Sequence, residues 1–150
     1  GVTSAIVDLG GNIVTVGSRP DGEPFRVAVQ KPFGASGEFS AVIPATNAAV
    51  VTSGTYERYF EENGVTYHHI LDPATGYPAE TGLTAVTIVC DRTVRPNAAT
   101  DADALSTVCF LLGQEAGLAL IDTLDGVEAL FVAADGTVTP SSGLVWEQPE

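Results

Sequence analysis

The sequence of 150 residues has few basic side chains and no methionine. Six Lys and Arg residues stand against 19 Asp and Glu residues, so the net charge is −13, and the basic residues form no cluster. Nucleic acid is excluded as a partner, because a phosphate backbone needs a basic surface. A small polyanionic ligand would also be repelled unless a divalent cation stood between its phosphates and the carboxylates of the protein.

Long apolar runs are also missing. The longest, at residues 108–112 and 129–134, are far shorter than the roughly 20 residues of a membrane-spanning helix, and the sequence does not begin with a signal segment. With 45% hydrophobic residues we expect a folded, soluble polypeptide. Because it begins without Met, in a strand-like stretch, we expect a processed or partial chain whose export signal would lie upstream.

Several common catalytic motifs do not occur either. The sequence contains no Cys-x-x-Cys, His-Glu-x-x-His, Walker loop or Gly-x-Ser-x-Gly elbow. The usual hydrolase and dehydrogenase templates therefore gain no support. The two cysteines, Cys90 and Cys109, lie in apolar surroundings and are expected to be buried, reduced thiols.

The hydrophobic pattern predicts an α+β fold. Strands are expected at residues 5–7, 13–17, 25–30, 39–44, 48–52 and 83–89, while residues 55–62 fit either a short helix or a strand. A helix is predicted from residue 100 or 101 to residue 112, ended by Gly113, followed by a second helix over residues 114–124. A hairpin over residues 127–139 closes the chain, and residues 147–150 are expected to form a loose tail. This order predicts one domain, residues 1–150, with a mainly antiparallel sheet packed against two consecutive helices.

Both histidines lie in one segment, residues 67–78, which reads Tyr-His-His-Ile-Leu-Asp-Pro-Ala-Thr-Gly-Tyr-Pro. Asp72 can bond to its own backbone in a turn, and Gly76 permits a positive φ. Adjacent histidines before such a turn suit a polar site for a phosphorylated ligand and a metal. In an extended segment His68 and His69 point to opposite faces, so at most one of them faces a ligand. The alternative is one surface histidine and one satisfied core histidine.

The start of the first predicted helix is a second candidate site. Thr100 as N-cap, with Asp103 at the third helical position, resembles a capping box, and this structural role accounts for both residues. Asp103 and Thr107, however, are four residues apart and project from one helical face. They pair a carboxylate with a hydroxyl, which are hard oxygen ligands suited to Mg²⁺. The hydroxyl-rich segment at residues 53–56 could contact a ring system, but its composition does not decide this.

Four motifs, in order, resemble the ApbE family of flavin transferases: Asp-Leu-Gly-Gly-Asn at 8–12, Thr-Ser-Gly-Thr-Tyr-Glu-Arg-Tyr-Phe at 52–60, the histidine segment at 68–78, and Ala-Asp-Ala-Leu-Ser-Thr at 102–107 followed by Phe-Leu-Leu-Gly at 110–113. The resemblance implies an ApbE-like, T-fold-like architecture. It also implies an enzyme that uses FAD as substrate and Mg²⁺ as cofactor, attaches FMN to a Ser or Thr hydroxyl of a target protein, and releases AMP. Such enzymes are typically exported to the outer face of the bacterial cytoplasmic membrane, often as lipoproteins, and serve flavoprotein subunits of respiratory or redox complexes.

By the same resemblance, Asp103 and Thr107 are the metal ligands, and His69 lies beside FAD near the chemistry. The rest of the flavin-binding segment falls on Asp72, Thr75 and Gly76. The resemblance covers only the C-terminal half of such a protein, so this chain alone is expected to be inactive. Two alternatives stay open: an FAD pyrophosphatase that yields FMN and AMP, and a noncatalytic flavin-binding module.

Overall fold

The computed structural model describes residues 1–149, and the predicted α+β fold is confirmed. Its elements are, in chain order, β1 (Ala5–Asp8), β2 (Asn12–Val16), β3 (Phe25–Gln30), β4 (Phe39–Ala45), β5 (Ala48–Gly54), β6 (Tyr59–Glu62), β7 (Val65–His68), β8 (Leu83–Asp91), α1 (Ala98–Leu112), α2 (Gln114–Ile121), β9 (Val127–Ala133) and β10 (Val138–Pro140). Within this range, no helix has the length and apolar character needed to span a bilayer.

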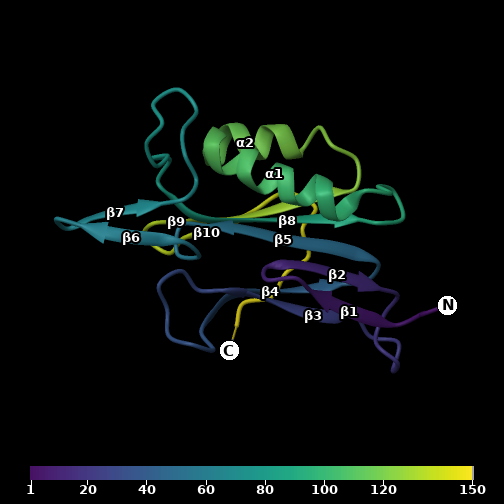
Figure 1. Cartoon of the computed structure of the whole chain (residues 1–150). Coiled ribbons are helices and arrows are strands. Elements are labelled where there is room, and N and C mark those ends of the chain that lie inside the picture. The colour runs from purple at the N-terminus through teal and green to yellow at the C-terminus, as the bar shows by residue number, and fades with distance from the viewer. Residues whose placement is uncertain (150) are drawn as a thin grey trace.

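The architecture is a layered one, centred on a six-stranded sheet with the order β1-β2-β5-β8-β9-β10, whose neighbouring strands run antiparallel. Helices α1 and α2 cover one face of this sheet, and the β3–β4 pair lies on the other side (Figure 1). The third pair, β6–β7, extends beyond the end of the sheet. Strand β8 is covered on both sides, which explains its nearly continuous apolar sequence.

Two hydrophobic cores follow from this layering. Because successive side chains of a strand point to opposite faces, Val50 of β5 packs toward β3–β4 while Val51 packs toward the helices. On the helix side the largest fully buried side chains include Phe110 of α1 and Phe131 of β9. Both cysteines are also buried on this side as free thiols, as predicted, and burial raises the pKa of each to about 11.

Helix α1 begins earlier than the sequence predicts. It starts at Ala98, with Asn97 at the N-cap, and the Asn97 side chain makes no capping hydrogen bond among residues 1–149. The predicted role of Thr100 as N-cap is therefore wrong. The physical reason is burial: Ala98 is only 2% exposed and packs into the core, so the first turn is held by tertiary contact and not by a side-chain cap. Gly113, with φ of 78°, ends α1 as predicted.

The structure also decides one segment for which the sequence allowed two possibilities, and it corrects another. Of the two possibilities for residues 55–62, the structure shows a turn followed by strand β6. The predicted loose tail is wrong at Glu147, which pairs with β4, whereas Glu150 lies outside the described residues. Glu147 exchanges two backbone hydrogen bonds with Val42 of β4, at 2.8 and 2.9 Å, and its carboxylate pairs with Arg26 at 2.7 Å. The unpaired edge of β4 thus supplies partners for the chain end.

The close packing of α2 on the sheet predicts that Gly117→Ala is destabilising. An added Cβ would lie 2.9 Å from two ring carbons of Phe131 and 3.3 Å from the Cys109 carbonyl oxygen. Overpacking a fixed core costs about 1–3 kcal/mol, and this exceeds the roughly 1 kcal/mol that alanine gains over glycine in a helix. We expect the free energy of unfolding, from urea titration of the intact protein, to fall by up to about 2 kcal/mol.

The exposed Ala119 on the same helix supplies the matched control. Ala119→Gly should cost about 1 kcal/mol through helix propensity alone. A Gly117→Ala protein more stable than wild type would show that the α2–β9 contact is looser than described.

Candidate functional site

The candidate oxygen ligands of α1, Asp103 and Thr107, lie where this helix crosses the sheet. Asp103 and Thr107 are both exposed and occupy successive turns of one helix face. Helix α1 packs on β5 and β8. The crossing places Ser53 of β5 beside the helix, with its Oγ 3.3 Å from Thr107 Oγ1 and 2.7 Å from Ser106 Oγ. The helix face therefore presents a carboxylate and a hydroxyl, and the Ser53 hydroxyl of β5 lies close to the latter.

The donor set can be tested against the requirements of Mg²⁺. This cation takes six oxygen ligands and is usually bound through one or two carboxylates, with waters and substrate phosphates completing the octahedron. Residues 1–149 contain no group of three or more His, Cys, Asp or Glu side chains arranged for a metal. Asp103 and Thr107 fit Mg²⁺ as two hard oxygen ligands, which is only part of an octahedral set.

His69 is held by the carbonyl oxygen of Arg58, just before β6. That oxygen accepts the His69 backbone N–H at 3.1 Å and lies 3.2 Å from the His69 ring Nδ1. Because a carbonyl oxygen only accepts hydrogen bonds, Nδ1 carries the proton in this contact. In the neutral ring Nε2 then has a free lone pair, and the side chain is exposed. This tautomer is the one that can accept a proton from a ligand.

His68 faces the helix. Its ring packs edge-on against Phe110 of α1, with the ring centroids 5.9 Å apart, and its Nδ1 is buried without a hydrogen-bond partner among the described residues. Burial lowers the pKa of His68, and the neighbouring His69 acts in the same direction. The predicted division between an inward and an outward histidine is confirmed by this geometry, although His68 is not fully satisfied.

The turn after the histidines is built from its own polar groups. Asp72 Oδ1 accepts the Ala74 N–H at 2.8 Å, and the Asp72 carbonyl accepts the N–H of Gly76, also at 2.8 Å. Gly76 has a φ of 73°, as the sequence predicts for this turn. Thr75 Oγ1 accepts the Tyr77 N–H at 3.3 Å, which leaves its own proton free to donate. These bonds fix the loop while leaving Thr75 and Gly76 exposed.

The two candidate segments meet through the His68–Phe110 contact. Phe110 follows Thr107 by three residues, or about 4.5 Å along a helix axis, and the loop after β7 rises on the helix side of the sheet (Figure 1). Within residues 1–149 no hydrogen bond or ion pair joins His69 or Asp72 to Asp103 or Thr107 directly. The histidine segment therefore contacts α1 at Phe110, near the C-terminal end of the helix and one turn beyond Thr107.

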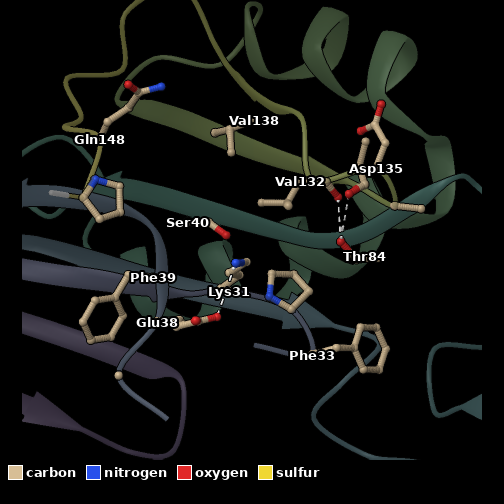
Figure 2. A pocket seen from close by; sticks show the side chains of 16 residues that line it. Lys31, Phe33, Glu38, Phe39, Ser40, Thr84, Val132, Asp135, Val138 and Gln148 are labelled. Carbon is tan, nitrogen blue, oxygen red and sulfur yellow. Dashed lines mark hydrogen bonds and ion pairs between the residues drawn. The ribbon is translucent and has the colours of Figure 1, made fainter. Parts of the chain in front are cut away.

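A separate hollow lies away from these residues. A cavity of about 750 Å³ opens between the β3–β4 loop, the β9–β10 turn and the chain end, as Figure 2 shows. Some of its polar groups are already paired: Lys31 with Glu38 at 3.3 Å, and the Thr84 hydroxyl donating to the Val132 carbonyl at 3.1 Å. None of the predicted site residues lines it. We therefore assign no ligand to this cavity.

The position of His68 predicts an acid-sensitive contribution to stability. Its pKa is lowered by burial, whereas the unfolded chain titrates near the ordinary value of 6.5. Below that pH the unfolded state binds more protons, so stability is present above about pH 6.5 and is lost as the pH falls. His68→Leu keeps an apolar contact with Phe110 without a titrating group. The wild-type free energy of unfolding should therefore fall more steeply than that of the variant between pH 7 and pH 5. Parallel urea-unfolding profiles for the two proteins would contradict the assigned burial.

Comparison with known proteins agrees with the α+β fold described above. The model of the ApbE family matches residues 1–131, and this chain belongs to that family.

Its relatives include the FAD:protein FMN transferase of Treponema pallidum, which is 43% identical over 150 residues, covering 95% of this chain and 40% of that protein. Among solved structures, the ApbE protein of Thermotoga maritima is 37% identical with a TM-score of 0.80, covering 93% of this chain and 43% of that one. The apo flavinyl transferase ApbE of Pseudomonas stutzeri is 36% identical with a TM-score of 0.71, over 95% and 42% of the two chains. The chain thus spans about two fifths of the length of these relatives.

Three functional candidates visible in the structure were not predicted from sequence: Arg58, Ser106 and the specific role of Ser53. Arg58 acts through its backbone carbonyl, which its side chain does not reveal. Ser106 reads as a buried helix position, and it is indeed fully buried. Ser53 was considered only as part of a loop that could contact a ring system, whereas the structure places it at Thr107. Ser53 and Ser106 are identified only by the long-range packing of β5 on α1, and Arg58 only by its backbone contact with His69.

Proposed function

We propose that this chain is the C-terminal part of a Mg²⁺-dependent FAD:protein FMN transferase, which attaches FMN to a Ser or Thr of a flavoprotein subunit of a respiratory or redox complex and releases AMP. The observation that supports this most is the exposed carboxylate and hydroxyl, Asp103 and Thr107, one turn apart on α1. The histidine segment contacts the same helix through His68 and Phe110, and the adjacent His69 has an Nε2 that is free to accept a proton. The names of the relatives support the same activity. Because the chain spans two fifths of their length, the complete site includes residues outside it.

The proposed reaction has a simple atom balance. The acceptor hydroxyl oxygen forms a bond to the phosphorus of the FMN half, and the bond from that phosphorus to the bridging oxygen breaks, so that AMP leaves. Bound Mg²⁺ neutralises charge on the diphosphate oxygens. Asp103 and Thr107 hold the cation, while His69 Nε2 takes the proton of the acceptor hydroxyl.

The loop after His69 is proposed to hold the flavin diphosphate. The Thr75 hydroxyl keeps a free donor, and an added Cβ at Gly76 would meet nothing within 4 Å, so a ligand can approach the backbone there. Asp72 contributes by holding the turn through the Ala74 N–H. With a net charge of −13, the chain would repel a diphosphate at this loop without the cation on α1.

The product distribution tests the proposal against its alternatives. The intact protein is incubated with FAD, Mg²⁺ and a candidate acceptor, and the mixture is separated on a denaturing gel. Flavin fluorescence on the acceptor band supports transfer. Soluble FMN and AMP without labelled acceptor would support a pyrophosphatase instead. Tight FAD binding without any product would support a noncatalytic flavin-binding module.

Localisation is proposed to follow the same family pattern. We expect the intact protein to be exported and anchored, as a lipoprotein, at the outer face of the bacterial cytoplasmic membrane. Protease added to intact spheroplasts should then degrade it, while a cytoplasmic marker stays protected. Protection of both proteins would contradict export.

A further inference from the structure

A chain of hydroxyl contacts connects β5 to the proposed cation ligands of α1. Ser53 Oγ lies 3.3 Å from Thr107 Oγ1 and 2.7 Å from Ser106 Oγ, and the Ser106 hydroxyl donates to the Asp103 carbonyl at 2.9 Å. Ser106 is fully buried, so its contacts are held in place by packing. Three hydroxyls and one carbonyl thus form a continuous series.

The proton count gives this series a direction. A hydroxyl has one proton to donate. Ser106 donates its proton to the Asp103 carbonyl, so it must accept in its contact with Ser53. Ser53 has then donated its only proton and can only accept from Thr107. Thr107 consequently directs its proton inward, toward β5, and its lone pairs are available on the opposite, exposed side.

We propose that Ser53 is a positioning residue that orients the Thr107 hydroxyl as a ligand for the cation. A metal binds the lone pair of a hydroxyl and not its proton, so a proton held inward prepares the ligand before the cation arrives. Partners behind a ligand commonly act in this way, by fixing its orientation. This inference rests on the proposed role of Thr107 at Mg²⁺ and adds β5 to the machinery of the site.

Strand β5 also provides a matched control. Thr52, the neighbouring residue, forms a similar hydroxyl–hydroxyl contact, with Thr87 Oγ1 at 2.8 Å, but its side chain points to the opposite face of the sheet. Thr52→Val removes one such contact without touching Thr107. A loss specific to Ser53→Ala therefore reports on the ligand and not on β5 as a whole.

The test is cation affinity, measured in the intact protein with FAD by the electron paramagnetic resonance signal of free Mn²⁺. Ser53→Ala should weaken Mn²⁺ binding by about 10–100-fold, whereas Thr52→Val should stay within about twofold. Ser106→Ala removes the hydroxyl that accepts from Ser53 and should also weaken Mn²⁺ binding. This variant replaces Ser53→Ala in the test if Ser53→Ala does not fold. In transfer assays Ser53→Ala should raise the Mg²⁺ concentration needed for half-maximal rate and leave the rate at saturating Mg²⁺ close to wild type.

A second comparison excludes a general effect on the site. In a Thr107→Ala background there is no hydroxyl to orient, so adding Ser53→Ala should cause no further loss of Mn²⁺ affinity. Equal losses in both backgrounds, or wild-type affinity in folded Ser53→Ala, would overturn the positioning role while leaving the proposed function intact. If the wild type itself bound no Mn²⁺ and transferred no FMN, the proposed function and this inference would fail together.

Discussion

His69→Ala is expected to lower the rate of FMN transfer by about 10²–10⁴-fold, the usual contribution of a positioned general base. The structure supports this role because the Arg58 carbonyl holds the ring through Nδ1 and leaves Nε2 free. The free energy of unfolding should change little, since the His69 side chain is exposed. Single-turnover transfer, followed by flavin fluorescence on the acceptor, measures the effect.

Two further variants separate base catalysis from simple contact. His69→Gln retains an amide donor for the Arg58 carbonyl but has no basic nitrogen, so it should be nearly as slow as His69→Ala. His69→Gly should regain part of its rate when imidazole is added to the solution, because the small molecule can replace the missing base. Transfer by His69→Ala within a few fold of wild type would remove the proposed role.

Asp103→Ala is expected to have the second large effect, a loss of about 10³-fold in transfer at ordinary Mg²⁺ concentrations. Charge neutralisation by a metal is worth several kcal/mol, and each 1.36 kcal/mol corresponds to a factor of about ten. Asp103 provides the only charged ligand proposed in this chain, and within residues 1–149 its carboxylate forms no hydrogen bond or ion pair. Removing the metal from the wild type with EDTA should produce a loss at least as large, which excess Mg²⁺ should reverse.

The neighbouring acid Asp101 supplies the control for charge. It lies on the same helix, and its carboxylate already pairs with Arg95 at 3.2 Å. Asp101→Ala removes the same charge without removing a proposed ligand, so transfer at saturating Mg²⁺ should stay within about threefold of wild type. Equal losses in the two variants would indicate that overall charge, and not coordination, determines the rate.

The sequence predicted those parts of the fold that depend on local pattern. The β-branched run that became β8 and the glycine that ends α1 both act through neighbouring residues, and both predictions are confirmed. The start of α1 could not be placed in this way, because it depends on the burial of Ala98 against a distant part of the core. The chain end shows the same limit: Glu147 is held by Val42, more than a hundred residues earlier.

In the candidate site, too, local features could be predicted from the sequence and long-range contacts could not. The turn at Asp72 and the spacing of Asp103 and Thr107 could be read from adjacent residues and from helix geometry. The contact between Ser53 and Thr107, and that between His68 and Phe110, could not, because each joins elements that are brought together only by packing. The family resemblance predicted the site residues, whereas the tautomer of His69 and the direction of the hydroxyl series follow from contacts that only the folded chain makes.

Mass spectrometry of the acceptor after incubation with the intact protein, FAD and Mg²⁺ tests the central claim most directly. We expect an FMN phosphodiester on a single Ser or Thr of the acceptor and an equal amount of AMP. Neither product should form when EDTA is present. AMP accompanied only by free FMN, or the same adduct formed without any divalent cation, would contradict it.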